Sequence, residues 1–184
     1  SPDEKVIIIS YKGEDPVGEE DLYYSEFVNG LWTKPEHMGN VINSTGYEIA
    51  PFLTSTKDTL FFSSNGFGGL GDADIFYSIK TGSGWKSWSK PINIGAPVNS
   101  SKFDAYINIA NDVIYFSSNR DTLRSDIFKT KAIYYRFIGT IRDKESLEPL
   151  EGAHLVIKNI EEDNNIVEEL YSDSQGLLDG ERLP

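Results

Sequence analysis

A glycine-rich stretch followed by two aspartates is the first pattern in the chain that could carry chemistry. Gly66, Gly68 and Gly71 have the Gly-x-Gly-x-x-Gly spacing of a dinucleotide-binding loop, and Asp72 and Asp74 follow them closely. Such a loop must open a helix, because the helix N-terminus meets the pyrophosphate. The β-prone run DIFYSI follows here instead. We therefore expect Gly66, Gly68, Gly69 and Gly71 to supply positive φ angles in a long hairpin loop.

The same aspartates raise the alternative of a calcium site. Asp72 and Asp74 belong to an oxygen-rich loop of the kind that suits Ca²⁺. Their spacing matches no complete calcium loop, and Asp72 has no counterpart in the third copy of the repeat described below. Asp74 recurs as Asp21 and Asp126, and a turn-capping carboxylate that accepts backbone N–H bonds explains the recurrence. We predict no metal and no cofactor, with calcium at Asp72 and Asp74 as the alternative.

Glu48 and Asp104 are candidates for a pair of catalytic carboxylates. Glycoside hydrolysis needs two carboxyl groups that face each other across a sugar. The two residues occupy equivalent positions in neighbouring repeats, so the repeat itself explains their presence without catalysis. We keep Glu48 and Asp104 as ligand-contact candidates and favour a structural role.

Three tryptophans could stack against sugar rings. Trp32 and Trp88 recur at one position of the repeat, which favours packing of an outer hairpin over ligand binding. Trp85 has no counterpart, so it is the better candidate for an exposed ligand contact. The two histidines, His37 and His154, have no carboxylate or second histidine at ligand spacing, and we expect them at surface or turn positions.

The chain contains an internal repeat of about 53 residues. The apolar runs VIIIS, LFFSS and IYFSS place Ile9, Phe62 and Phe116 at nearly equal spacings along the chain. An acidic residue opens a second strand after each run, at Asp21, Asp74 and Asp126. The segments WTKPEHMGNVINS and WSKPINIGAPVNS also match, and they align Trp32 with Trp88.

Each repeat therefore holds about four short strands separated by Gly, Asn, Asp and Ser turns. Repeats of this length with four strands are typical of β-propeller blades. No window of useful length has a helical period. The sequence predicts an all-β chain: a partial propeller of four-stranded blades over 1–133, with further blades upstream, and an incomplete small β-sandwich over 134–184.

Composition limits the partners of the chain. The 184 residues carry a formal net charge of −12, which argues against nucleic acid because phosphate binding needs a basic face. It also argues against electrostatic docking to anionic lipid. The absence of cysteine excludes disulfides and thiol catalysis. No apolar run approaches the length of a membrane span, and no Gly-x-Ser-x-Gly hydrolase motif is present.

The segment 1–133 resembles a known repeat family. The runs SPDEKVIIIS, TSTKDTLFFSSN and ANDVIYFSSNR, each followed by D-[IL]-[FY], are similar to the TolB-like, WD-repeat-like propeller repeat. The intervening GSGWKSWSKPINIGAPVNS is similar to a hairpin in OmpA-like envelope proteins of Bacteroidota. The segment FIGTIRDKESLEPLEGAHLVIKN resembles the opening of a carboxypeptidase-regulatory-like domain, which follows the blades in those proteins.

This resemblance implies a function without catalysis. The implied protein is a periplasmic, outer-membrane-associated scaffold that binds other envelope proteins. It is a candidate component linking a type IX secretion or gliding machine to peptidoglycan. Peptidoglycan would be bound by an OmpA-like domain outside this chain. Two alternatives stay open: a carbohydrate-binding or glycan-active propeller, and the accessory propeller of a peptidase.

Overall fold

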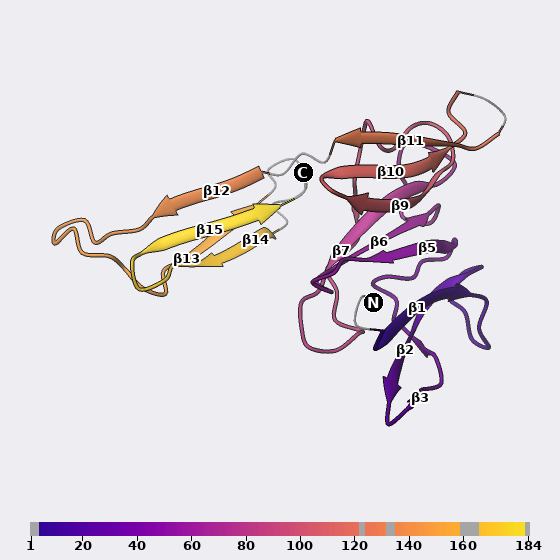
Figure 1. The fold of residues 1–184 in the computed structure, drawn as a ribbon, viewed down its shortest axis with the longest axis horizontal. Coiled ribbons are helices and arrows are strands. Elements are labelled where there is room, and N and C mark those ends of the chain that lie inside the picture. The colour runs from indigo at the N-terminus through magenta and orange to yellow at the C-terminus, as the bar shows by residue number, and fades with distance from the viewer. Residues whose placement is uncertain (1–3, 122–123, 132–134, 159–165, 183–184) are drawn as a thin grey trace. The chain divides into compact units, whose positions relative to one another are not determined.

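A computed structural model describes residues 4–121, 124–131, 135–158 and 166–182 as an all-β protein (Figure 1). These residues form antiparallel sheets and contain no helix, so none of them provides an apolar helix that could cross a membrane. The chain divides into two compact units, 1–132 and 133–184, one residue before the predicted boundary.

Unit one contains three sheets that follow the three repeats. The first sheet comprises β1 (Val6–Tyr11), β2 (Asp21–Val28), β3 (Leu31–Trp32) and β4 (Glu36–His37), with both short strands paired to β2. The second has the order β5 (Glu48–Leu53), β6 (Thr59–Ser64), β7 (Asp74–Ile79) and β8 (Ile92–Asn93). The third has the order β9 (Asp104–Ala110), β10 (Val113–Ser118) and β11 (Asp126–Lys131).

The register repeats from sheet to sheet. Tyr11 pairs with Asp21, Ser64 with Asp74 and Ser118 with Asp126, so each acidic residue opens its strand at the same place. An irregularity interrupts both β5 and β9, at Ala50 and Tyr106, which have positive φ angles of 52° and 58°. The sequence repeat is therefore also a structural repeat, down to an individual β-bulge.

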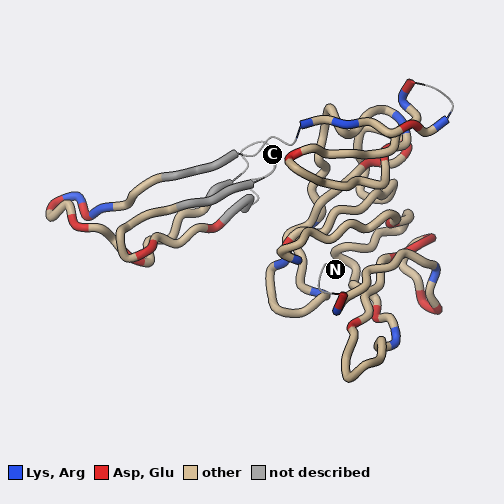
Figure 2. Tube along the Cα trace, in the orientation of Figure 1, with Lys and Arg blue, Asp and Glu red and all other residues tan. Residues whose placement is uncertain are grey.

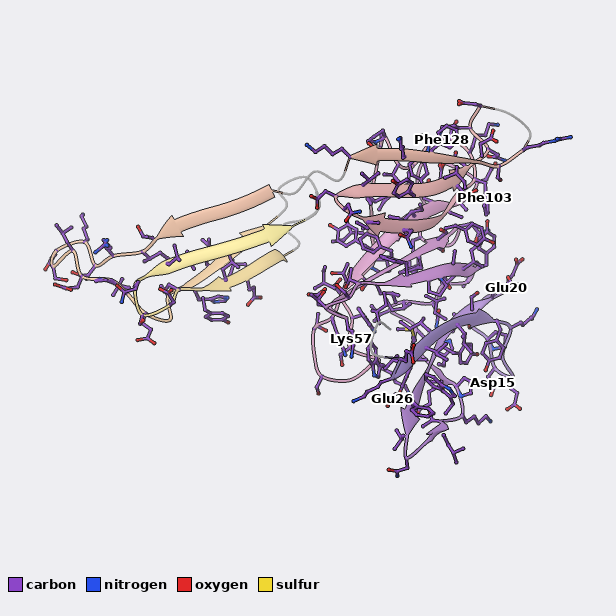
Figure 3. The ribbon with its side chains drawn as sticks, in the orientation of Figure 1. Asp15, Glu20, Glu26, Lys57, Phe103 and Phe128 are labelled. Carbon is purple, nitrogen blue, oxygen red and sulfur yellow. The ribbon has the colours of Figure 1, made fainter. Side chains whose placement is uncertain are left out.

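The sheets stack through their faces. β5 packs against β1 and β2, and β9 packs against β5, β6 and β7. Apolar side chains fill the space between the first and second sheets, and this core comprises Val6, Leu22, Tyr24, Met38, Ile42, Leu60, Phe62, Phe76, Trp85 and Trp88. Alternate residues of one strand point to opposite faces, so Phe61 and Ile75, both 0% exposed, lie on the opposite face of the second sheet. Figure 3 draws the side chains on the ribbon.

Unit two is smaller. β12 (Tyr135–Thr140) pairs with β15 (Leu177–Arg182), and β13 (His154–Lys158) pairs with β14 (Ile166–Tyr171). The turn after Arg142 is organised by the exposed Asp143 carboxylate, which accepts bonds from the backbone N–H groups of Glu145 and Ser146. These hydrogen bonds lower the pKa of Asp143.

The glycine-rich loop has two kinds of glycine. Gly68 and Gly69 have positive φ angles of 74° and 150°, as expected. The expectation is wrong for Gly66 and Gly71, whose φ angles are not positive. They are needed because the backbone passes close to neighbouring groups: a Cβ on Gly71 would lie 2.2 Å from the carbonyl oxygen of Lys102.

We expect Gly71→Ala to lower the free energy of unfolding by about 1–3 kcal/mol, because the added methyl group must displace backbone between two sheets. Urea denaturation followed by tryptophan fluorescence measures the change. Gly84→Ala is the matched control, since the nearest atom to its Cβ would be 3.9 Å away. Equal stability of the two variants would contradict this role of Gly71.

Candidate functional site

The acidic residues that open β2 and β7 cap the loops that precede them. Asp21 and Asp74 are 0% and 1% exposed. The Oδ2 of Asp21 accepts the N–H of Val17 at 2.6 Å, and the Oδ2 of Asp74 accepts the N–H of Leu70 at 2.5 Å. Both carboxylates therefore behave as turn caps that replace water around the loop backbone. Asp126 occupies the same register position and is exposed.

The structure does not assemble a metal site at Asp72 and Asp74. The Asp72 side chain is exposed, whereas Asp74 is buried and its Oδ2 already accepts N–H bonds from Leu70, Gly71 and Asn93. The Oδ1 of Asp74 is buried and has no hydrogen-bond partner among the described residues. Across those residues there is no group of three or more His, Cys, Asp or Glu side chains that could hold a metal ion.

An asparagine closes the outer edge of the first sheet, and another closes the outer edge of the second. The Oδ1 of Asn43 accepts the N–H of Leu22 at 2.7 Å, and its Nδ2 donates to the Leu22 carbonyl at 3.1 Å. Asn99 makes the same two bonds to Ile75, both at 2.8 Å. The two asparagines are 1% and 2% exposed. Each side chain thus satisfies both backbone polar groups of a strand residue, as a neighbouring strand would.

A second side chain links this asparagine to the buried aspartate. In the second repeat, Asn93 Nδ2 donates to Asp74 Oδ2 at 3.1 Å, and Asn93 Oδ1 accepts from Asn99 Nδ2 at 2.7 Å. His37 occupies the equivalent place in the first repeat, with Nε2 3.1 Å from Asp21 Oδ2 and 2.9 Å from Asn43 Nδ2. The sequence spacing did not indicate this carboxylate, because Asp21 lies 16 residues before His37.

The hydrogen bonds of His37 fix its neutral tautomer. The N–H of Gly39 donates to His37 Nδ1 at 3.0 Å, so a neutral ring carries its proton on Nε2 and donates it to Asp21. His37 Nε2 then presents a proton close to Asn43 Nδ2, which is also a donor, so the two groups compete. In the second repeat Asn93 avoids this competition, because its amide oxygen accepts the bond from Asn99 Nδ2. The offset that relates Trp32 to Trp88 also relates His37 to Asn93, and could have revealed this equivalence.

The other histidine lies in unit two. His154 Nε2 lies 2.8 Å from Glu169 Oε2, and its ring stacks on Tyr171 with centroids 4.5 Å apart. Both partners of the ion pair are 41% exposed, so the histidine occupies a surface position as expected, with a carboxylate partner that the sequence did not suggest.

Glu48 and Asp104 are buried at the start of β5 and β9, both at 0% exposure. Glu48 accepts bonds from the backbone N–H and hydroxyl of Ser44 and from the hydroxyl of Ser64. Burial raises the pKa of Glu48, and the bonds from the two serines oppose that rise. The carboxylate therefore binds protein groups where a sugar-cleaving carboxylate would face a ligand.

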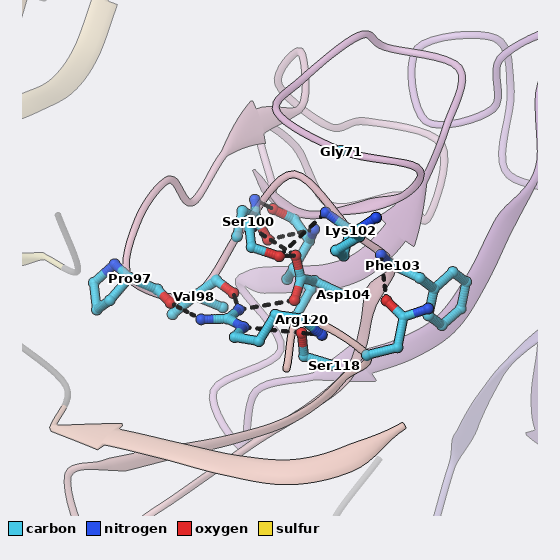
Figure 4. A network of polar contacts seen from close by, with 12 residues as sticks. Gly71, Pro97, Val98, Ser100, Lys102, Phe103, Asp104, Ser118 and Arg120 are labelled. Carbon is cyan, nitrogen blue, oxygen red and sulfur yellow. Dashed lines mark hydrogen bonds and ion pairs between the residues drawn. The ribbon is translucent and has the colours of Figure 1, made fainter. Parts of the chain in front are cut away.

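Asp104 is satisfied differently, by an arginine (Figure 4). Its Oδ1 accepts from the guanidinium of Arg120 at 2.8 Å, and its Oδ2 accepts from the backbone N–H and hydroxyl of Ser100. Arg120 also donates to the carbonyls of Pro97 and Val98. Gly66 occupies the position equivalent to Arg120 in the second repeat. Glu48 therefore has no arginine partner there, and the contacts that Glu48 and Asp104 make between sheets differ chemically.

The structure reverses the roles expected of Trp85 and Trp32. Trp85 is buried at 9% exposure, donates to Glu26 Oε1 at 3.0 Å and lies under the Lys80 ammonium, so it is not the predicted exposed contact. Trp88 is buried at 5%, as predicted for an anchor. Trp32 is 42% exposed, and its ring meets Phe27 at 5.2 Å. The cause is loop length, because the loop 81–87 folds over the first sheet whereas the first repeat turns at Asn29 and Gly30.

The tight turn of the first repeat displays an apolar cluster that the sequence analysis missed. Asn29 and Gly30 have φ angles of 52° and 84°, which suits a two-residue hairpin turn. The flanking side chains form what we call the hairpin cluster, exposed at 42%, 50%, 74% and 42% for Phe27, Val28, Leu31 and Trp32 respectively. The Asn-Gly pair between apolar residues was the available sequence signal.

No family model matches the chain, and a search of the curated proteins finds no similar protein.

We expect His37→Asn to fold with a free energy of unfolding within about 0.5 kcal/mol of the parent, because Asn93 makes the equivalent contacts in the second repeat. His37→Ala should lose about 1–3 kcal/mol, since Asp21 and the N–H of Gly39 lose a partner. Thermal and urea unfolding of the two variants measure the difference. If alanine is tolerated as well as asparagine, the bond from His37 to Asp21 does not stabilise the fold.

Glu48→Gln should change how stability depends on pH. The folded-state pKa of Glu48 is raised from 4.5, so the folded protein binds more protons than the unfolded chain above about pH 4.5. The favourable contribution of Glu48 is present at lower pH and is lost as pH rises through the folded pKa, by about 1.4 kcal/mol per pKa unit. Between pH 4.5 and 7 the difference in unfolding free energy should therefore shift in favour of Glu48→Gln.

Urea titrations at several pH values measure that difference. Asp104→Asn is the control, because it removes the ion pair with Arg120 and should be less stable than the parent throughout the range. If the unfolding free energies of the parent and Glu48→Gln depended on pH in the same way, the folded-state pKa of Glu48 would not be raised and the prediction would be wrong.

Proposed function

We propose that the chain is a non-enzymatic protein-interaction module, built as part of a β-propeller and carried by an envelope scaffold protein. The observation that carries the proposal is the hairpin cluster, because four adjacent large apolar side chains on a surface mark a contact with another protein. Aromatic residues of this kind supply much of the binding energy in protein interfaces.

The stacked repeats support a scaffold role. The hairpin cluster projects from a sheet whose outer edge is clamped by Asn43 and whose face is covered by Trp85. A binding surface on such a sheet loses little conformational freedom on contact, which favours affinity. The resemblance of the repeats to TolB-like, WD-repeat-like blades supports the propeller architecture and a periplasmic location at the outer membrane.

The wider role follows from the same resemblance. The module would connect envelope proteins, including a type IX secretion or gliding machine, to peptidoglycan held by a domain outside this chain. The carbohydrate-binding and glycan-active alternatives were based on Trp85, Glu48 and Asp104. All three side chains are buried and hydrogen-bonded to protein groups. No observation on the described residues favours those alternatives or the peptidase one.

Site-specific photo-cross-linking tests the proposal. A photoreactive residue at position 31 should give a discrete cross-linked protein in an outer-membrane preparation of the source cells, and Leu31→Ser with Trp32→Ser should reduce its recovery at least tenfold. The same probe at Leu70, which is 55% exposed on a different loop, is the control. Equal labelling from both positions, or saturable binding of this chain alone to a glycan panel, would contradict the proposal.

A further inference from the structure

The first two repeats each contain an outer segment, which we define as residues 36–43 and 92–99. Both read x-[His/Asn]-apolar-Gly-x-x-apolar-Asn. The short strand that opens each segment pairs with the long strand that begins at the buried aspartate, Glu36 with Tyr24 and Ile92 with Tyr77. The segment then satisfies the edge of that strand through the His/Asn and Asn contacts described above. Its apolar side chains Met38, Ile42 and Val98 are buried, at 0%, 0% and 3% exposure.

Among the residues that the structure describes, the third sheet has the strand that would receive this segment but not the segment itself. In the part of the chain that the structure describes, β11 pairs with β10 alone. Ser10, Ser63 and Ser117 pair with Leu22, Ile75 and Ile127 respectively. The N–H and C=O of Leu22 and Ile75 point to the outer edge, where Asn43 and Asn99 hold them. The shared register places the same two groups of Ile127 at the open edge of β11.

The side chains at this edge are also uncovered. Leu22 and Ile75 are both 0% exposed, because the outer segment and the following sheet cover them, whereas Ile127 is 83% exposed. Asp126 matches the buried Asp21 and Asp74 but is exposed, and its side chain makes no hydrogen bond to any described residue. An unpaired strand edge beside an exposed isoleucine is a template for strand addition.

Charge at the edge adds a preference for the incoming residue. Lys129 occupies the register position of Tyr24 and Tyr77, and Lys131 lies two residues further along the same strand (Figure 2). The residue paired with this position is Glu36 in the first repeat and Ile92 in the second. An acidic residue opposite Lys129 forms a favourable cross-strand pair, so a segment of the first-repeat type suits β11 better.

We propose that the outer edge of β11 is an acceptor site for an extended segment of a partner polypeptide, with the pattern Glu-[His/Asn]-apolar-Gly-x-x-apolar-Asn. The segment adds as a fourth strand: its His or Asn binds Asp126, its final Asn holds the N–H and C=O of Ile127, and its glutamate pairs with Lys129. This is β-strand addition, in which main-chain bonds give affinity and the side chains give specificity. The assignment rests on the edge of the third sheet and is independent of the hairpin cluster and of the cellular location.

A labelled peptide tests the site directly. The probe is the 34–44 sequence, KPEHMGNVINS, carrying a fluorophore, titrated with the full chain and followed by fluorescence anisotropy. We expect saturable binding of one peptide per chain. Replacing the peptide's Asn43 by alanine, or Asp126 of the protein by alanine, should each weaken binding at least tenfold.

A charge exchange identifies the strand that is occupied. Lys129→Glu should weaken the parent peptide at least tenfold and should bind the peptide with Glu36→Lys more tightly than the parent peptide. The positions equivalent to Lys129 in the other two sheets are Tyr24 and Tyr77, so rescue can come only from β11. Lys129 is exposed, and circular dichroism of the variant verifies that it folds.

Three results would overturn the proposal. The first is no saturable binding, and the second is binding that is indifferent to both Asn43→Ala and Lys129→Glu. The third is a dimer of the chain alone in analytical ultracentrifugation that Lys129→Glu dissociates. The third result would make a second copy, exchanging its own outer segment, the occupant of the edge.

Discussion

The three-sheet unit depends on how its buried backbone polar groups are satisfied. The long strands are only six to eight residues long, and the short strands β3, β4 and β8 have only two residues each. A two-residue strand cannot satisfy the whole edge of its neighbour, so side-chain amides complete the pairing. Asn43 and Asn99 do this at the residue after each buried aspartate. Because an unpaired buried N–H or C=O costs about 1–3 kcal/mol, these amides permit Leu22 and Ile75 to be fully buried.

Buried polar groups also join each sheet to the next one along the chain. Glu48 and Asp104 each follow an outer segment by a few residues and open the first strand of the next sheet. The serines that bind them, Ser44 and Ser100, belong to the connection itself. The connection is therefore fixed at both ends, by an asparagine to the sheet it leaves and by a carboxylate to the sheet it enters. Apolar packing fills the space between the sheets, and these polar contacts fix their register.

The sequence predicted the repeating parts of this arrangement and missed the parts that differ between repeats. The strand runs and the acidic residues Asp21, Asp74 and Asp126 recur at nearly constant spacing, so their positions could be read from the chain. The burial of Trp85 could not, because it depends on the loop 81–87 folding over the first sheet, and no other copy contains that loop. The neighbourhood of His37 was missed because its carboxylate partner lies 16 residues away on another strand. Only the alignment with Asn93 connects the two positions.

The different chemistry at positions 66 and 120 makes the two contacts between sheets unequal. The contact that ends at Glu48 holds a carboxyl group through hydroxyl and amide donors, and its burial favours the protonated form. The contact that ends at Asp104 holds an ion pair with Arg120, and the desolvation cost of such pairs falls as temperature rises. A rise in pH therefore weakens the contact that ends at Glu48, because it removes the protonated form that burial favours, whereas the contact that ends at Asp104 depends on its ion pair with Arg120.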